Sequence, residues 1–219
     1  MDERVSNIAK AYDNIDAAKR YYDSNKSKNF RGVISHKQFL CVFSNLDYDF
    51  FGEKPAALDV GCNSGRYVKE LVDRGFNATG IDTAGIPLEY ASKRIDARFI
   101  KASATDMPLK QKSFDLVICM ELLHHFEDEV LERVLREISR VMKPGGLFIF
   151  DVKNKMNPVL WYKYKREDSV GFTLKARTNR QMKKLVEGYG LRVINKKGIF
   201  FPFTLFAPYV IFFAQKEIL

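Results

Sequence analysis

Residues 56–72 hold the feature that most constrains the fold: a short apolar run, a turn of small residues and a helical pattern. Residues 56–60 read Ala-Ala-Leu-Asp-Val, so the run contains one acid, Asp59. Such runs are typical of strands buried on both faces, as in a parallel sheet. Gly61 and Gly65 bound the turn that follows, where glycine lets the backbone turn sharply and approach a ligand. Strand, glycine turn and helix together predict a nucleotide-type cofactor site at the carboxyl end of a sheet.

The spacing of the glycines separates the cofactors that use such a turn. A phosphate-binding loop needs four residues between its glycines, followed by Lys and Ser or Thr, but here Gly65 comes too soon and Arg66 follows it. A dinucleotide fingerprint needs glycine at offsets 0, 2 and 5, where this chain has Gly61, Asn63 and Arg66. The turn therefore favours a cofactor without a pyrophosphate, and an ordinary strand-to-helix turn is the alternative.

A second short apolar strand is predicted over residues 77–81, and Asp82 follows it. Asp82 lies 21 residues beyond Gly61, close to the spacing of about 20 at which a carboxylate accepts hydrogen bonds from ribose hydroxyls. An ionised carboxylate is a strong acceptor for both hydroxyls of a cis-diol. A lone Asp is more often a solvated loop acid, but the strand ending and the spacing favour a ribose-binding role.

Three later segments complete a longer pattern. They read Ala-Ser-Ala-Thr-Asp-Met-Pro-Leu at 102–109, Ser-Phe-Asp-Leu-Val-Ile-Cys-Met-Glu-Leu-Leu-His-His-Phe at 113–126, and Lys-Pro-Gly-Gly-Leu-Phe-Ile-Phe-Asp at 143–151. With the glycine turn, these segments resemble the class I S-adenosylmethionine (SAM)-dependent methyltransferases, in particular the subgroup that includes the quinone-biosynthesis enzymes. The resemblance covers residues 56–151 in order and spacing. It departs at Asn63, a residue type that tolerates positive φ in place of the family's middle glycine, and at Ser103, which replaces an adenine-contacting Asp.

The resemblance implies SAM as the cofactor and S-adenosylhomocysteine as its product, and it assigns roles to individual residues. Asp59 would orient the methionine end above the glycine turn, Asp82 would bind the ribose, and Ser103 and Ala104 would contact the adenine. Met120 and Glu121 would border the methionine moiety. The cofactor-binding residues expected from the resemblance are Asp59, Gly61, Cys62, Asn63, Gly65, Asp82, Thr83, Ser103, Ala104, Thr105, Met120, Glu121 and His125.

A catalytic base is needed if the acceptor is a hydroxyl, and His124 and His125 are weak candidates because histidine changes charge near neutral pH. The interpretation that we favour is structural: one ring is buried, and the other lines the cofactor pocket. The three cysteines are scattered, with no metal-ligand spacing, so we expect no metal site.

Strand and helix patterns alternate from residue 56 to residue 152, which predicts an α/β fold with a parallel sheet and helices on both faces. The resemblance implies a Rossmann-like sheet of seven strands, mostly parallel, with an antiparallel last strand. We expect one compact domain in three parts: an N-terminal helical cap (1–54), a SAM-binding core (55–152) and a C-terminal part (153–219) that completes the sheet and carries substrate-side insertions. The predicted helices are 5–25, 35–46, 66–74, 87–94, 128–142 and 179–188, and the predicted strands are 56–60, 77–81, 97–100, 114–120, 147–152, 191–194 and 209–215.

The net charge of +9 is concentrated at one end of the chain. Residues 151–219 hold 14 Lys and Arg against 5 Asp and Glu, whereas residues 55–150 hold 13 against 14. Such asymmetry indicates an anionic partner or substrate, or simply a solvated basic face. Residues 199–213 add seven aromatic side chains, which would complete the core, line an apolar pocket or touch a membrane surface.

The absence of a signal-peptide pattern in the first 25 residues, and of any apolar run of about 18 residues, predicts a cytoplasmic protein without a spanning helix. The scattered cysteines suit a reducing compartment.

We therefore expect a SAM-dependent methyltransferase that acts on a small or lipid-like acceptor, with an acidic acceptor and peripheral membrane contact as options. An RNA or protein methyltransferase is the alternative, because basic and aromatic residues at 161–166 suit single strands. Against nucleic acid, no base-amine motif and no nucleic-acid module occur. A SAM-binding subunit without catalytic activity is a third hypothesis.

Overall fold

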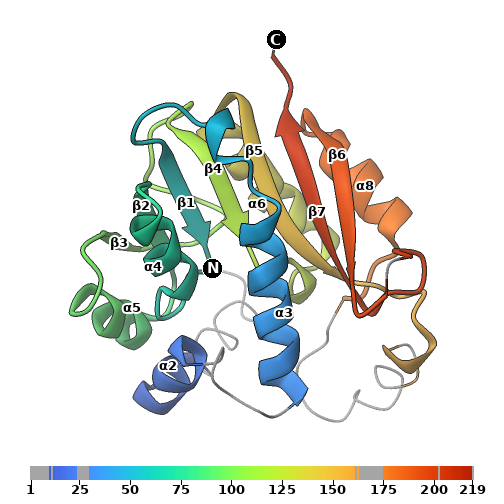
Figure 1. The fold of residues 1–219 in the computed structure, drawn as a ribbon, viewed down its shortest axis with the longest axis horizontal. Coiled ribbons are helices and arrows are strands. Elements are labelled where there is room, and N and C mark those ends of the chain that lie inside the picture. Colours follow the sequence, from blue (N-terminus) through green and yellow to red (C-terminus); the bar gives the residue numbers. More distant parts are fainter. Residues whose placement is uncertain are drawn as a thin grey trace.

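The computed structural model describes residues 10, 12–23, 30–160, 162, 175–201 and 203–218. One twisted sheet of seven strands runs through this part of the chain in the order β3-β2-β1-β4-β5-β7-β6 (Figure 1). Only β7 runs antiparallel to its neighbours, β5 and β6. This confirms the predicted fold class, including the antiparallel last strand. The strands are β1 (Ala56–Val60), β2 (Asn77–Asp82), β3 (Arg98–Lys101), β4 (Phe114–Cys119), β5 (Met142–Lys153), β6 (Leu191–Ile199) and β7 (Tyr209–Lys216).

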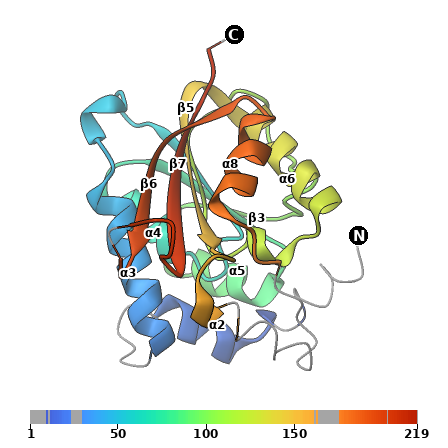
Figure 2. The same ribbon diagram turned by 90° about the vertical axis from the view of Figure 1, so that its right-hand side faces the viewer.

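Helices cover both faces of the sheet (Figures 1 and 2). On one face α3, α4 and α5 pack against the sheet through residues such as Phe43, Leu71 and Leu88. On the other face α6 and α8 contribute Leu135 and Val186 to a second core. The helical elements are α2 (Ile15–Tyr22), α3 (Phe30–Ser44), η2 (Tyr48–Phe50), α4 (Arg66–Asp73), α5 (Gly85–Ser92), η3 (Leu123–His125), α6 (Asp128–Val141) and α8 (Asn179–Glu187).

The predicted bounds differ from the structure at both ends of the chain and at β5, which begins at Met142 rather than at residue 147. Within the helix expected over 5–25, the structure describes α2 and a few flanking residues, and the rest lies outside the described residues. Helix α3 begins at Phe30 rather than at residue 35. Strand β6 continues five residues past the predicted end at residue 194, through polar positions 195–197. Polar side chains are tolerated there because β6 is an edge strand with one side open to solvent.

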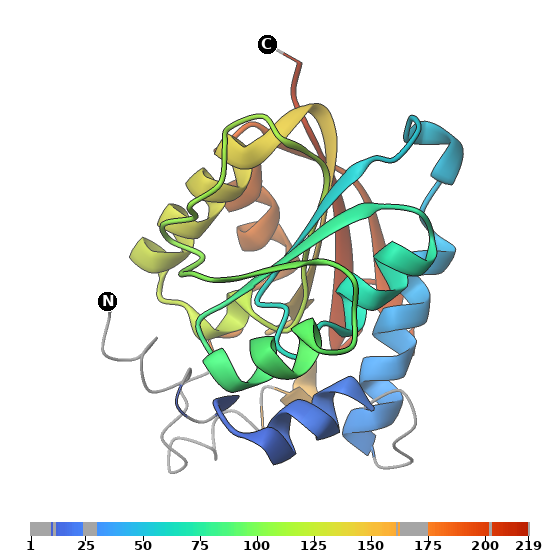
Figure 3. The same ribbon diagram turned by 90° about the vertical axis from the view of Figure 1, so that its left-hand side faces the viewer.

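The carboxyl ends of the parallel strands meet at one edge of the sheet, which we call the carboxyl edge. β1 ends there before Gly61, β2 ends at Asp82 and β4 ends before Met120. Helix α2 lies across this edge beside α5 (Figure 3), where the rings of Tyr22 and Tyr90 meet edge to face with centroids 5.7 Å apart. The topology therefore places the ends of the motif-bearing strands under the N-terminal segment.

No helix in the described ranges is long and apolar enough to cross a membrane.

Candidate cofactor site

A cavity of about 140 Å³ opens at the carboxyl edge. Its wall is built from the turn after β1, the end of β2, the loop after β3, the segment after β4, and side chains near and within α2. A second hollow, beside His124, is far smaller, about 10 Å³. The lining residues are Tyr12, Tyr21, Gly61, Asn63, Ile81, Asp82, Thr83, Ala102, Ser103, Ala104, Met120, Glu121, Leu122, His125 and Phe126.

The turn after β1 takes its shape from left-handed backbone at three positions: Gly61 (φ 77°), Asn63 (φ 47°) and Gly65 (φ 78°). The amides of Gly61 and Cys62 donate to the carbonyl of Ile81, at 2.8 and 3.0 Å, and tie the turn to β2. Asn63 thus occupies the middle glycine position of the motif in the positive-φ conformation that Asn tolerates.

The two glycines of the turn serve packing as well as conformation. A Cβ on Gly65 would lie 2.8 Å from Cδ1 of buried Ile95 and 3.1 Å from the ring of Phe99, which is partly buried against the same core. Neither Gly65 nor Cys62 lines the cavity. The small size of Gly65 lets the start of α4 pack closely against the region around β3. Its role beside a bound cofactor stays a prediction.

Asp82 presents its carboxylate to the cavity at the end of β2. Its Oδ2 accepts from the Asn63 amide at 2.8 Å, and its Oδ1 accepts from the Ala84 amide at 2.9 Å. Burial raises the pKa of Asp82, while the amides of Ala84 and Asn63 oppose that shift. Since a carboxylate oxygen has two lone pairs, the fixed carboxylate can still accept from a ligand in the cavity.

Asp59 lies outside the lining and is 2% exposed. Its Oδ2 has no hydrogen-bond partner among the described residues. Burial raises the pKa of Asp59 to about 8, against the lowering influence of Arg66. Arg66 itself is buried between α3 and aromatic rings: its Nη1 donates to Ser35 Oγ at 2.6 Å, and its guanidinium carbon lies 5.2 Å from the Tyr21 ring centre.

The loop after β3 contributes Ala102, Ser103 and Ala104 to the lining. The hydroxyls of Ser103 and Thr105 lie 2.8 Å apart, and the Thr105 amide donates to Ser103 Oγ at 3.2 Å. Thr105 is outside the lining, and Asp106 is exposed. The wall of the cavity at this point is thus mostly apolar, with one hydroxyl.

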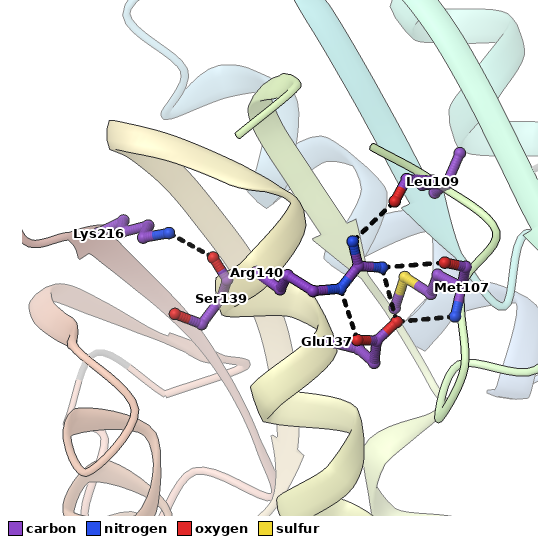
Figure 4. Close-up of polar contacts among 6 residues, drawn as sticks. All are labelled: Met107, Leu109, Glu137, Ser139, Arg140 and Lys216. Atoms are coloured by element: carbon purple, nitrogen blue, oxygen red, sulfur yellow. Dashed lines mark hydrogen bonds and ion pairs between the residues drawn. The ribbon is translucent and has the colours of Figure 1, made fainter. Parts of the chain in front are cut away.

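A clamp from α6 fixes the continuation of this loop (Figure 4). The Met107 amide donates to Glu137 Oε2 at 2.8 Å. Arg140 donates to the carbonyls of Leu109 and Met107, at 2.7 and 2.9 Å, and pairs with Glu137. At the same helix end, Lys216 Nζ donates to the Ser139 carbonyl. The cavity wall is therefore anchored to a helix that does not line the cavity.

The segment after β4 contributes Met120, Glu121 and Leu122. Glu121 has a positive φ of 57°, and its amide donates to Asp151 Oδ1 at 2.5 Å. Helix α3 reaches both acids, because Ser35 Oγ donates to Glu121 Oε1 at 3.2 Å and Gln38 Nε2 donates to Asp151 Oδ2 at 3.2 Å. Burial raises the pKa of Asp151 to about 6. Helix α3 is thus joined by hydrogen bonds to the segment that lines the cavity after β4.

The two candidate histidines have different surroundings, although their ring centroids are only 4.2 Å apart. His125 lines the cavity, whereas His124 is buried beside the smaller hollow. Burial lowers the pKa of both rings, with Lys153 as a further cause, and the pKa of His125 falls to about 4. Both rings are therefore uncharged at neutral pH.

Six lining residues were not among the expected site residues: Tyr12, Tyr21, Ile81, Ala102, Leu122 and Phe126. Four of them directly neighbour expected residues along the chain. Tyr12 and Tyr21 come from the N-terminal segment, far away in sequence. The amphipathic pattern there marks Tyr12 as part of an apolar face, but nothing in the pattern shows where that face packs. No cluster of three or more metal-ligating side chains occurs in the described ranges.

Comparison with known proteins finds a family model that matches part of the chain. Residues 58–150 match the family model described as a methyltransferase domain. The match identifies residues 58–150 as similar to a methyltransferase domain, and the sheet order described above is the fold expected of the class I SAM-dependent methyltransferases that the sequence resembles.

The curated relatives include ubiquinone biosynthesis O-methyltransferases. The protein from Colwellia psychrerythraea is 36% identical over 104 residues, 45% of this chain and 42% of the relative. The one from Chromobacterium violaceum is 34% identical over 152 residues, 63% of this chain and 60% of the relative. The chain thus spans about half the length of the curated relatives it matches.

Among solved structures, the fold is similar to magnesium protoporphyrin IX methyltransferase from Synechocystis with bound S-adenosylhomocysteine. The TM-score is 0.71 at 17% identity, and the superposition covers 97% of this chain and 100% of the other.

Proposed function

We propose that this chain binds SAM in the cavity at the carboxyl edge and transfers its methyl group to a small or lipid-like acceptor. One observation carries the proposal: segments from four separate motifs, represented by Gly61, Asp82, Ser103 and Glu121, line a single cavity. The methyltransferase-domain match over residues 58–150 and the named relatives support the same chemistry.

The residues present fit the cofactor. The Asp82 carboxylate, held by two backbone amides, has lone pairs left for a ribose diol. Ala102 and Ala104 offer an apolar wall for a flat base, with the Ser103 hydroxyl between them. Glu121 brings a carboxyl group to the cationic methionine end of the ligand. Buried Asp59, one residue before the end of β1, lies in the strand that leads into the glycine turn. Bound SAM supplies a methyl group activated by its sulfonium.

The protein's contribution is to position the acceptor and exclude water, which can account for a large share of such a rate enhancement. We propose that Tyr12 and Tyr21 cover the cavity from the N-terminal side, as the cap expected over residues 1–54. With a pKa of about 4, His125 can accept a hydrogen bond from an acceptor hydroxyl but is a weak base. We therefore assign His125 to positioning, and His124 to the buried structure.

The names of the relatives favour oxygen as the nucleophilic atom, because those relatives are O-methyltransferases of ubiquinone biosynthesis. We also place the enzyme in the cytoplasm, since Cys41, Cys62 and Cys119 are all free thiols.

A transfer assay with SAM carrying a labelled methyl group tests the proposal. The acceptors are a panel of phenolic and lipid-like small molecules, total RNA and a protein extract. Asp82→Ala is the control, and it should lower transfer when SAM is limiting. Label on a small or lipid-like acceptor supports the proposal. Label only on RNA or protein favours the alternative acceptor class, and SAM binding without transfer to any acceptor favours the non-catalytic subunit.

A further inference from the structure

The loop between β6 and β7 exposes five large apolar side chains in a row of seven residues. Phe200, Phe201, Phe203, Leu205 and Phe206 are between 42% and 78% exposed, and we call them the aromatic platform. Single exposed apolar residues are ordinary, but a contiguous group marks an interaction surface. Met156 and Val159, in the segment after β5, are also exposed, at 46% and 74%.

Asparagine side chains fix the platform in its exposed position. The carboxamide of Asn154, which is fully buried, donates to the carbonyls of Thr204, Leu205 and Ala207 at 2.8–3.2 Å. Asn157 Nδ2 donates to the Phe206 carbonyl at 2.8 Å, and Asn179 Nδ2 donates to the Thr204 carbonyl at 2.7 Å. Three side chains from two other segments thus hold this loop backbone while its apolar side chains face solvent.

The surroundings of the platform are basic. Lys37 lies over the Phe200 ring at 5.2 Å, and the neighbouring segments carry Lys155, Lys196 and Lys197. Residues 152–162, 175–186 and 188–216 contain no Asp or Glu. An apolar group held in place beside several lysines has two attractions for one kind of surface: apolar contact with the interior of a bilayer and charge attraction to its anionic exterior.

The platform lies at the carboxyl edge, the same edge as the cavity. β6 is parallel to the strands that end at the cavity, so its carboxyl end at Ile199 leads into the loop at that edge. Figures 1 and 2 show the β6–β7 loop at the same end of the sheet as α2, with the C-terminus of the chain at the opposite end.

We propose that the aromatic platform docks this protein on a bilayer that contains anionic lipids, with the carboxyl edge facing the membrane. A second copy of the chain fits less well, because two-fold pairing of the same surface would oppose lysines to lysines. The four Phe rings of the platform are able to stack bases, so single-stranded RNA is the competing occupant. We favour the bilayer because Leu205, Met156 and Val159 add exposed apolar surface that has no ring and suits a lipid interior. The docking goes beyond methyl transfer, and it presents the cavity edge to acceptors dissolved in the lipid.

Vesicle flotation of the whole protein tests the docking. The vesicles are phosphatidylcholine alone, or phosphatidylcholine mixed with phosphatidylglycerol, at low and high salt. The main variant is Phe203→Ser, at the most exposed platform position (78%), and its matched control is Ile218→Ser, an exposed apolar residue (81%) at the opposite end of the sheet. A charge variant, Lys196→Gln with Lys197→Gln, is matched by Lys110→Gln with Lys112→Gln.

We expect the wild type to float with the anionic vesicles more than with the neutral ones, and less at high salt. Phe203→Ser should weaken binding about tenfold, which is the scale of one buried Phe side chain, and the lysine pair should weaken it by several-fold. Both controls should bind like the wild type, and SAM binding should be unchanged in all variants, which separates this test from the proposed function.

The proposal is overturned if the wild type floats with neither vesicle, or if Phe203→Ser and Ile218→Ser bind alike. It is equally overturned if Phe203→Ser abolishes dimer formation or RNA binding in a protein that does not bind vesicles.

Discussion

At the residue scale, the cavity depends on a few carboxyl groups whose surroundings differ sharply. Asp82 is held by backbone amides and faces the cavity, while Asp59 is buried outside the lining with a pKa raised to about 8. Asp106, nearby in the loop after β3, is exposed. Substitution of the three acids should therefore have different effects on SAM affinity and on the pH dependence of stability.

Asp82→Ala should weaken SAM binding by tenfold or more, because hydrogen bonds to a charged group are worth about 1.5–3 kcal/mol each. Asp106→Ala, its control, should leave the affinity unchanged, since Asp106 lies outside the lining. Calorimetric titration of both variants measures the difference. Equal losses would show that the acid at the ribose has been assigned wrongly.

Asp59→Asn should change how stability depends on pH. The folded-state pKa of Asp59, about 8, lies above its ordinary value of 3.8. The contribution of Asp59 to the free energy of unfolding of the wild type therefore falls as the pH rises between those two values, by up to about 1.4 kcal/mol per pH unit. Asn removes that slope. The variant should therefore gain stability relative to the wild type as pH rises through this window.

Denaturant unfolding of both proteins at several pH values is the measurement. His125, whose pKa is lowered to about 4, has the opposite effect and favours folding less as pH falls, but it is present in both proteins and cancels in the difference. A constant difference across the window would mean that Asp59 is ionised in the folded protein at neutral pH.

At the scale of elements, the motif-bearing strands were predictable, because β1, β2 and β4 are short apolar runs with defined endings. The seven-stranded sheet with its antiparallel last strand followed from the family resemblance. The polar half of β6 could not be predicted as a strand, because an edge strand need not be apolar. The contacts of α2 and α3 with the cavity depend on packing between segments distant in sequence. Local pattern marks their apolar faces but not the partners of those faces.

Arg140→Ala should weaken SAM binding without removing any group from the cavity. Loss of the guanidinium frees the carbonyls of Met107 and Leu109 from the clamp on α6, so the Ser103–Ala104 wall is held less firmly. We expect an affinity loss of several-fold, from one or two hydrogen bonds of about 1 kcal/mol each. Arg133→Ala, at an exposed position on the same helix, is the control. Identical affinities for the two variants would show that the clamp serves stability alone.

At the scale of the whole molecule, the carboxyl edge gathers the cavity, the N-terminal helices and the aromatic platform. Tyr12 and Tyr21 reach the cavity from outside the segment that the family model matches, 58–150. We propose that this N-terminal part acts as a cap and that the C-terminal part carries the contacts with the acceptor's surroundings.

S-adenosylhomocysteine should slow amide hydrogen exchange in α2, because a ligand in the cavity would contact Tyr21 and stabilise the packing of α2 over the cavity. Exchange in α8, on the far face of the sheet and outside the lining, is the internal control. Protection confined to α8, or protection that is uniform across the molecule, would contradict the role of the N-terminal part as a cap.

The central claim is that one cavity at the carboxyl edge holds the methyl donor, and a crystal structure of the protein with S-adenosylhomocysteine tests it most directly. The account predicts ribose hydroxyls within hydrogen-bond distance of the Asp82 carboxylate, the adenine against Ser103 and Ala104, and the amino-acid end beside Glu121. Ligand density elsewhere on the molecule, or a ribose with no contact to Asp82, would contradict it.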